Sequence, residues 1–360
     1  MLSAVAIICV LGLLIAFHEL GHFLVAKLVG VGVQTFCLGF GPKLFRVKWG
    51  QTDFSLAAIP LGGYVRLVGE SNEDDELPPG FTPRQSYMKR PPWHRMAIVL
   101  AGPIFNFVLA VLLYWLLFWS QGVYELKAVV GKVTPDMPAQ AAGIEPGDRI
   151  LAIDDQPIEY WDDLAATVSA SKGRALVLTL ARGERTFSVT VTPQVMTVKN
   201  LFGEDVESAK IGVMASGETV AIPLGPGEAA SQATDKSWQV ISLTFQTFLK
   251  LLQRVVPFDA VGGPIMIAQL VSEQAKEGLG NLVALTAFIS INLGVVNLLP
   301  IPVMDGGLLV FYCVELILGR PVNRRIQEIT TRIGLALIIT LMFLAIFNDL
   351  QRLFKWPSLL

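Results

Sequence analysis

The sequence predicts a membrane protein built mainly from α-helices, with four transmembrane helices, a membrane-dipping β element and one extracytoplasmic α+β domain. Three observations favour this fold class. Of the 360 residues, 52% are hydrophobic and only 16% are charged, whereas soluble domains average roughly 25% charged residues. Apolar stretches long enough to cross a bilayer occur four times along the chain. A stretch of ordinary polarity, residues 127–215, lies between the second and the third of them.

Composition also narrows the classes of function. The formal net charge is −2, so the charge balance gives no indication of nucleic-acid binding. The three cysteines, Cys9, Cys37 and Cys313, have neither the spacing of a metal site nor the number needed for a disulfide framework. We interpret them as small apolar residues of the interior.

The first transmembrane helix is predicted within residues 1–30, where an apolar run ends at Lys27. At a rise of about 1.5 Å per residue this run can span a hydrocarbon core of about 30 Å. It has no basic residues at its start and is longer than the apolar part of a signal peptide. We therefore expect a retained helix rather than a cleaved leader.

Three polar residues, His18, Glu19 and His22, interrupt this helix. An ionisable group at bilayer depth is costly and usually marks a functional site. The two histidines are four positions apart, so both rings project from one helix face and can bind one metal ion. Glu19 lies at the flank of that face, where it can act as a general base without being a ligand. This His-Glu-x-x-His pattern is typical of zinc hydrolases.

A third metal ligand is predicted far along the chain. Catalytic zinc usually has three protein ligands and one open position. Asp305 is the outstanding candidate, because it follows Pro300 and Pro302 and precedes two glycines in an otherwise apolar sequence. Such a sequence predicts an unwound stretch within the membrane. We expect one Zn²⁺ per chain, held by His18, His22 and Asp305.

Residues 31–70 are predicted to form the membrane-associated β element. Four short stretches alternate in the manner of strands and are separated by turn residues, namely 33–36, 44–49, 52–56 and 60–65. They are unusually apolar for an exposed ribbon. Non-helical backbone is tolerated at membrane depth only beside protein or a wet cavity, so we expect this element beside the first helix.

Residues 71–95 are predicted to form a cytoplasmic loop with an acidic cluster at positions 73–76 and an interfacial anchor at Trp93, His94 and Arg95. The second transmembrane helix, residues 96–120, contains Asn106, a polar side chain that must find a partner in lipid. Two interpretations are open: a hydrogen bond to another helix, or a position facing the metal site.

Residues 127–215 resemble a PDZ domain of the bacterial, circularly permuted type, on the sequence Ala142-Gly143-Ile144-Glu145-Pro146-Gly147-Asp148-Arg149-Ile150-Leu151-Ala152-Ile153. PDZ domains bind extended peptides by strand addition. The domain could bind the new C-terminus left by an earlier cut, or act as a steric gate against substrates with bulky outer domains. The gate is favoured, because no strong carboxylate-binding loop is evident.

The rest of the chain completes the membrane part. Residues 216–280 are predicted to be a linker and an amphipathic bracing helix, 281–318 a third transmembrane segment, and 319–360 a cytoplasmic loop with the fourth helix. Lysine and arginine are concentrated in the loops 27–95 and 319–332. The positive-inside rule therefore places both loops in the cytoplasm and the PDZ-like domain and both termini outside it.

Three motifs in this order resemble the site-2 protease family of zinc intramembrane proteases: Phe17-His18-Glu19-Leu20-Gly21-His22, Gly102-Pro103-x-x-Asn106, and Asn297-x-x-Pro300-x-Pro302-x-x-Asp305-Gly306. Gly39-Phe40-Gly41, Pro60-Leu61-Gly62-Gly63-Tyr64 and the PDZ-like insert are similar to its bacterial regulator-of-sigma-E protease branch. The chain has one PDZ-like signature where well-known members have two. It also has Met304 where the family often has leucine, a swap that we expect to be silent.

The resemblance implies zinc binding by His18, His22 and Asp305 and acid–base catalysis by Glu19. It associates Asn297 and the β element, with Gly39, Gly41, Gly62 and Gly63, with substrate handling, and we expect Asn106 to contribute. The expected activity is cleavage within transmembrane segments of single-span proteins, such as an anti-sigma factor or signal-peptide remnants, in the bacterial inner membrane. The alternative is a non-catalytic membrane PDZ receptor or scaffold with a structural metal.

Overall fold

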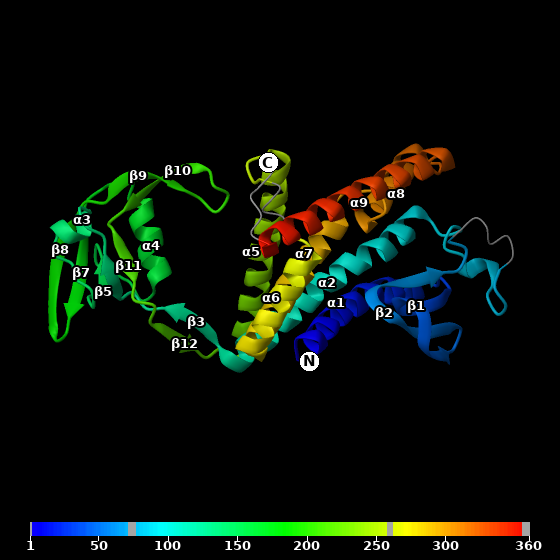
Figure 1. Ribbon diagram of the computed structural model, residues 1–360, viewed down its shortest axis with the longest axis horizontal. Helices are drawn as coiled ribbons and strands as arrows, with labels where there is room; N and C mark the ends of the chain where they lie inside the picture. The colour runs from blue at the N-terminus through cyan, green and yellow to red at the C-terminus, as the bar shows by residue number, and fades with distance from the viewer. Residues whose placement is uncertain (1, 71–76, 258–261, 355–360) are drawn as a thin grey trace. The chain divides into compact units, whose positions relative to one another are not determined.

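The computed structural model describes residues 2–70, 77–257 and 262–354; the predicted acidic cluster at 73–76 lies outside them. Within the described residues, four helices are long and apolar enough to cross a membrane. They are α1 (Leu2–Leu28), α2 (Pro92–Gln121), α7 (Leu279–Leu298) and α9 (Arg324–Phe354). The prediction of a multi-pass helical membrane protein with four spanning helices is thereby confirmed (Figure 1).

The chain divides into two units. The first comprises Met1–Leu117, Ala230–Phe248 and Pro257–Leu360, and the second comprises Phe118–Ala229 and Leu249–Val256. The four spanning helices belong essentially to the first unit. The insert of ordinary polarity lies in the second unit.

Helices α1 and α2 approach each other most closely at small residues. A Cβ atom added to Gly21 would lie 2.2 Å from the carbonyl oxygen of Ala101, a distance that no side chain tolerates. Glycine therefore allows the two backbones to touch at this point. Pro103 lies inside α2 without ending it. This close approach decides which residues of α2 meet the polar face of α1.

The third predicted span, 281–318, is two helices in the structure. Helix α7 ends at Leu298, and α8 (Asp305–Leu318) follows after an irregular segment. Val303 in that segment has a φ of 87°. The irregular segment lies where the sequence predicted an unwound stretch, because Pro300 and Pro302 cannot continue the helix.

Helix α6 (Pro264–Glu277) is capped by a residue of the last spanning helix. The carboxylate of Asp349 accepts hydrogen bonds from the backbone N–H groups of Gly263, Ile265 and Met266 at 2.9–3.1 Å. These N–H groups have no partner within a helix, so a carboxylate at this position satisfies them. The contact ties α9 to α6.

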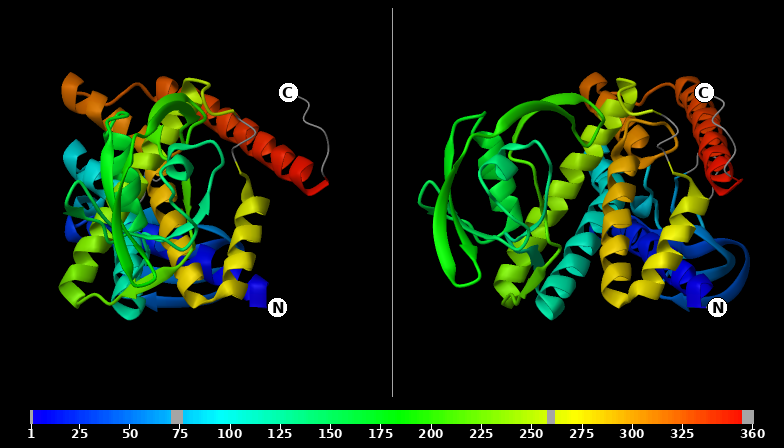
Figure 2. Two further views of the ribbon diagram at one scale, coloured as in Figure 1. Left: turned by 90° about the vertical axis from the view of Figure 1, so that its left-hand side faces the viewer. Right: turned by 60° about the vertical axis from the view of Figure 1, so that its left-hand side comes forward.

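Two long bent strands, β1 (Val33–Trp49) and β2 (Thr52–Leu67), replace the four short strands that were predicted. They pair with each other twice, so four segments lie side by side in the order 43–49, 52–57, 33–40 and 63–67. Gly39, Gly41 and Gly62 have φ values of 90°, 87° and 113° at the bends, where glycine is the residue that adopts such angles readily. The sheet packs beside α1 (Figure 2).

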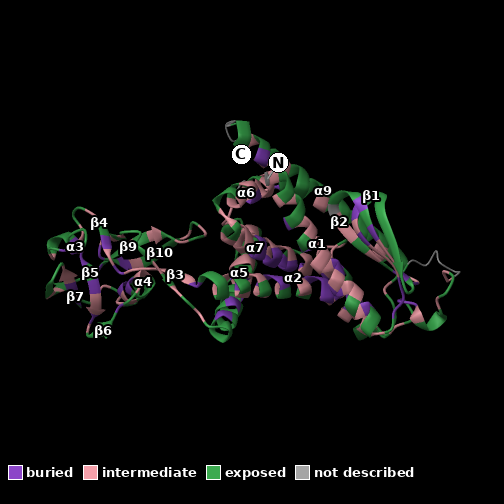
Figure 3. Cartoon of the chain, turned by 90° about the horizontal axis from the view of Figure 1, so that it is seen from below, coloured by how far each residue is buried: buried purple, intermediate pink, exposed green. Residues whose placement is uncertain are grey.

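Among the described residues of the first unit, buried side chains form apolar clusters, of which two surround α1. One is built from Val10, Leu14, Leu109 and Val271, and the other from residues of α1, the sheet, α2 and α8, including Ala26, Val33 and Ile98. Figure 3 shows buried positions along α2 and α7, whereas most of α9 is exposed. The exposed apolar side chains of α9 are suited to lipid.

The second unit is a small α+β structure. Its elements are β3 (Val123–Leu126), β4 (Val130–Val133), α3 (Pro138–Ala141), β5 (Arg149–Ile153), β6 (Gln156–Pro157), α4 (Trp161–Ala170), β7 (Leu176–Arg182), β8 (Arg185–Val191), β9 (Gln194–Lys199), β10 (Asp205–Lys210), β11 (Val213–Ala215) and β12 (Thr219–Ile222). A four-stranded sheet of order β6-β5-β7-β8 carries the core, in which Ile150, Leu178 and Leu180 are fully buried.

The β9–β10 hairpin was not predicted. It pairs Asp205 with Lys199 through Lys210 with Gln194 and extends the second unit beyond the recognised PDZ-like signature. Helix α5 (Pro226–Leu252) lies within the region 216–280 that was predicted to hold a linker and a bracing helix, and contributes residues to both units. In the first unit, the Thr244 hydroxyl of α5 donates to Asn292 Oδ1 of α7 at 3.2 Å.

Candidate metal centre and catalytic cavity

Helix α1 presents two imidazoles toward one point. His18 and His22 are one turn apart, their rings are edge-to-face with centroids 4.8 Å apart, and their Nε2 atoms are separated by 3.2 Å. The i, i+4 spacing of the sequence therefore gives the shared face that was expected.

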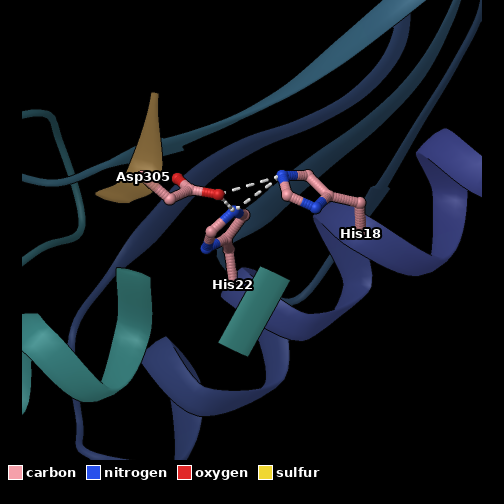
Figure 4. Close-up of side chains that lie close together, drawn as sticks. All are labelled: His18, His22 and Asp305. Carbon is pink, nitrogen blue, oxygen red and sulfur yellow. Dashed lines mark hydrogen bonds and ion pairs between the residues drawn. The ribbon is translucent and has the colours of Figure 1, made fainter. Parts of the chain in front are cut away.

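Asp305 reaches the same point from the first residue of α8 (Figure 4). Its Oδ2 atom lies 3.3 Å from His18 Nε2 and 3.7 Å from His22 Nε2. The preceding segment turns sharply, and a Cβ atom on Gly306 would lie 2.2 Å from the carbonyl oxygen of Leu299. The sequence Asp305-Gly306-Gly307 thus allows the close turn that carries the carboxylate to α1.

The donor set fits a zinc ion. Three atoms bound at 2.0–2.1 Å to one tetrahedral centre lie about 3.3 Å from one another, close to the spacings found among the two Nε2 atoms and the carboxylate oxygen. Asp305 Oδ2 is buried and accepts no hydrogen bond. A buried carboxylate oxygen without a donor is costly, and a cation between the three atoms would satisfy it.

Helix α2 supports both histidines from behind. His22 Nδ1 lies 2.8 Å from the carbonyl oxygen of Ile98, and His18 Nδ1 lies 3.2 Å from the amide nitrogen of Asn106. A Cβ atom added to Gly102 would lie 2.3 Å from His22 Nε2 and 2.7 Å from His18 Cε1. Glycine at this position therefore leaves the space that the imidazoles occupy.

Glu19 is held by the sheet. The backbone N–H of Val65 hydrogen-bonds its carboxylate. Gly63 allows this approach, because a Cβ atom there would lie 3.0 Å from Glu19 Cγ and 2.9 Å from the carbonyl oxygen of Cys37. Glu19, the two histidines and Asp305 line one cavity of about 390 Å³. Glu19, the candidate general base, and the candidate ligands therefore share one cavity.

A polar cluster that sequence reasoning missed lines another part of this cavity. Arg95, predicted to be an interfacial anchor, is 4% exposed and donates to Glu315 of α8 at 2.5 Å. Its guanidinium also lies 4.8 Å from the ring of Tyr312, whose hydroxyl is 2.9 Å from that of Tyr87. Burial raises the pKa of Tyr87 well above its usual range, so the phenol stays protonated. In the sequence, the signal that could have indicated this cluster was the presence of two opposite charges, Arg95 and Glu315, in otherwise apolar segments.

The other predicted site residues are not members of the candidate metal group. Asn297 is half-buried near the end of α7, and Gly39, Gly41 and Gly62 occupy bends of the sheet. Asn106, predicted to bind substrate, is fully buried against His18, so no substrate reaches its side chain in this structure. Within the described residues, the group able to hold a metal ion comprises His18, His22 and Asp305, and does not include His94.

Comparison with known proteins decides the family. The model of peptidase family M50 matches residues 6–341. The chain belongs to peptidase family M50. Members of this family are metalloproteases of the site-2 protease type, so the prediction of an intramembrane zinc metalloprotease family is confirmed.

Relatives match over nearly the full length. A protein of Mesorhizobium japonicum, provisionally named a zinc metalloprotease, is 37% identical over 361 residues, 97% of this chain and 98% of the relative. One from Campylobacter jejuni with the same description is 34% identical, over 97% and 93% of the two chains. The regulator of sigma-W protease RasP of Bacillus subtilis is 28% identical, over 98% and 99%.

Proposed function

We propose that this M50 protein is a zinc-dependent endopeptidase that cleaves within the transmembrane segments of single-span membrane proteins. The observation that carries the proposal is the convergence of His18, His22 and Asp305 beside Glu19 in one cavity of a membrane-spanning helix bundle. A structural zinc site is normally closed by four protein ligands. The three ligands found here favour catalysis over the alternative of a receptor or scaffold.

The roles of the residues follow from their positions. His18, His22 and Asp305 would hold one Zn²⁺, which when bound supplies a Lewis acid that activates water and polarises the scissile carbonyl. The carboxylate of Glu19 takes a proton from the attacking water and gives it to the nitrogen of the leaving amine. Val65 N–H holds that carboxylate in place. Asn297 remains the candidate for binding the substrate backbone.

The pairing of the strands limits where an unwound substrate could bind to the sheet. A transmembrane helix hides its peptide bonds in hydrogen bonds and must unwind before water can attack. Segments 36–38 and 55–56 have neighbouring strands on both sides, so a substrate strand cannot pair with them. The edge nearest Glu19 is 63–67, where the N–H groups of Val65 and Leu67 already serve Glu19 and Glu70. This edge therefore positions Glu19 and forms a wall of the cavity.

The exposed side of the sheet suits a membrane-dipping element. Large apolar side chains gather there, among them Phe40, Phe45, Val47 and Trp49, the last being 79% exposed. Lipid would cover them. The charge distribution of the loops supports an orientation in the bacterial inner membrane with the second unit and both termini outside the cytoplasm.

The second unit would act on the substrate's outer part as a PDZ-like domain. A largely apolar groove of about 300 Å³ lies between α4 and Ile211-Gly212-Val213, the arrangement that suits a peptide added beside a strand. This groove supports peptide binding more than the sequence alone did, and a steric gate remains the second candidate. An anti-sigma factor is the favoured substrate class, since one relative is named for regulating a sigma factor.

The test is Glu19→Gln in the full-length protein. We expect the variant to keep its zinc and lose cleavage of single-span proteins, because the amide cannot accept the proton. Crosslinking in native membranes should then trap uncleaved single-span proteins. Cleavage at the wild-type rate would contradict the proposed role of Glu19, and a scaffold would show no accumulation of uncleaved proteins in the variant.

A further inference from the structure

The two candidate histidine ligands each turn their second ring nitrogen toward α2. We propose that Asn106 is a positioning residue, which accepts a hydrogen bond from Nδ1–H of His18 and so keeps Nε2 of that ring free to bind the metal. The proposal rests on the metal site proposed above. It replaces the expectation that Asn106 binds substrate.

His22 shows the arrangement that a ligating imidazole needs. Its Nδ1 atom lies 2.8 Å from the carbonyl oxygen of Ile98. A carbonyl oxygen can only accept, so Nδ1 carries the proton and Nε2 presents a lone pair. A hydrogen bond of this kind fixes the tautomer and the orientation of metal-binding histidines in general.

His18 has the side chain of Asn106 in the corresponding place. The amide lies with Nδ2 3.2 Å from His18 Nδ1, while Oδ1 is buried and has no hydrogen-bond partner. The two ends of an amide have nearly the same shape, and hydrogen bonding decides which end faces a given partner. A half-turn of the amide brings Oδ1 against His18 Nδ1 and preserves the single amide–imidazole contact.

The convergence of the ligand atoms decides between the two amide orientations. If Nδ2 donated to Nδ1, neutral His18 would carry its proton on Nε2, 3.2 Å from His22 Nε2 and 3.3 Å from Asp305 Oδ2. That proton would occupy the position where a metal ion binds. With Oδ1 as the acceptor, all three atoms offer lone pairs to one centre, as a Zn²⁺ ligand set must.

The backbone of Asn106 is itself anchored. The hydroxyl of Ser290 on α7 donates to the carbonyl oxygen of Asn106 at 2.7 Å, and both side chains are fully buried. Helix α7 therefore fixes the position from which Asn106 reaches His18. The metal ligands of α1 are thus oriented by α2, which is in turn held by α7.

The experiment compares zinc affinity in two nearly isosteric variants of the full-length protein in detergent. Asn106→Leu keeps the volume and removes the acceptor, and Asn106→Asp keeps an acceptor oxygen. Each protein is stripped of metal and titrated with Zn²⁺ against a competing chelator. We expect Asn106→Leu to bind zinc about 10- to 100-fold more weakly, and Asn106→Asp to stay within about threefold of the wild type.

Asn292→Leu is the matched control. Asn292 is an asparagine of α7 that bonds Thr244 and the backbone of Phe288, with no contact to the histidines, so its variant should bind zinc as the wild type does. Only three histidines are present, so ¹⁵N-histidine NMR of the zinc-free protein can read the tautomer directly. We expect Nδ1 of His18 to be protonated in the wild type and this preference to be lost in Asn106→Leu.

The outcomes separate this proposal from the one on which it rests. Wild-type zinc affinity in Asn106→Leu, or equal losses in Asn106→Leu and Asn106→Asp, would overturn the role of Asn106 while leaving the metal site intact. Protonated Nε2 of His18 in the wild type would also overturn it. A wild-type protein that binds no zinc would instead overturn the proposed function.

Discussion

Single residues decide whether the metal ligands can meet. Gly21 lets the backbones of α1 and α2 touch, and Gly102 leaves room for the two imidazoles. Neither residue carries chemistry of its own. Their contribution is space, which a single methyl group would fill.

Gly102→Ala tests this contribution. The added Cβ atom would lie 2.3 Å from His22 Nε2, so the ring or the helix must move and the ligand set is broken. We expect zinc affinity to fall by at least about tenfold, as for other changes that misplace ligands. Equilibrium zinc titration of the purified protein measures the effect.

Gly12→Ala is the control for that substitution. Gly12 also lies in a spanning helix, and a Cβ atom there would meet no atom within 4 Å. Alanine is the better helix former, so zinc affinity should be unchanged. Equal zinc affinity in both variants would contradict the account of Gly102.

The candidate catalytic residues could be predicted from the sequence, because an ionisable residue within an apolar segment has a high free-energy cost and stands out there. His18, Glu19 and His22 interrupt an apolar helix at ligand spacing, and Asp305 follows a helix-breaking sequence. The supporting residues were less predictable: a position of Asn106 facing the metal site was one of two open interpretations, and Ile98 was not singled out. The roles of Ile98 and Asn106 depend on which face of α2 crosses α1, and no local pattern carries that information.

At the scale of elements, the sheet edge 63–67 positions Glu19, the proposed general base. Val65 donates its backbone N–H to Glu19, a donor that among the natural substitutions only proline removes. Sequence alternation predicted strands in this region. It could not show that two bent strands pair twice, which makes 63–67 an edge and leaves 36–38 in the interior of the sheet.

Val65→Pro removes this donor. Proline lacks the backbone N–H, so the Glu19 carboxylate loses its hydrogen bond while His18, His22 and Asp305 are untouched. We expect cleavage in a reconstituted assay to fall by at least about tenfold. A tenfold change in rate corresponds to roughly 1.4 kcal/mol, which is about the contribution of one hydrogen bond to a charged group. Zinc content should stay at the wild-type level.

Lys48→Pro is the comparison at the opposite edge of the same sheet, segment 43–49. It introduces the same backbone change far along the sheet from Glu19. This variant should keep both zinc and cleavage. If Val65→Pro cleaved as fast as Lys48→Pro, the proposed role of the Val65–Glu19 hydrogen bond in catalysis would be refuted.

At the scale of the whole molecule, each of the two units is stabilised by its own kind of interaction. The first contains a buried ion pair, Arg95 with Glu315, and presents apolar side chains outward. The second has a conventional core and a buried carboxylate, Asp148, which accepts two hydrogen bonds from Arg182 and one from the backbone N–H of Glu145. Acid should therefore affect the second unit in a predictable way.

The hydrogen bonds from Arg182, and that from Glu145, hold the pKa of Asp148 below its usual range. A depressed pKa stabilises the folded state above the unfolded-state value of about 3.9, and this stabilisation is lost as the pH falls through the folded value. We expect Asp148→Asn to lower the free energy of unfolding of the second unit at pH 7 and to flatten the decline of that free energy below about pH 4. Hydrogen exchange across 149–182 in the full-length protein measures both, and an unchanged acid profile would contradict this.

The positions of the spanning helices along the chain were predictable from hydropathy, because the membrane requires long apolar segments. The division of the third segment into α7 and α8 was only partly so: the prolines marked a break, but not that Asp305 begins a new helix. The buried pair of Arg95 and Glu315 was missed because each residue lies near a helix end, where a charge ordinarily faces water.

The most direct test of the central claim is the zinc content of purified full-length protein, measured by mass spectrometry of the metal for the wild type, Glu19→Gln and Asp305→Ala. If residues of α1 and α8 bind one metal ion together, the wild type and Glu19→Gln should contain close to one Zn²⁺ per chain. Asp305→Ala should lose most of its zinc. Wild-type zinc content in Asp305→Ala would contradict the account, because the site would then not need the carboxylate of α8.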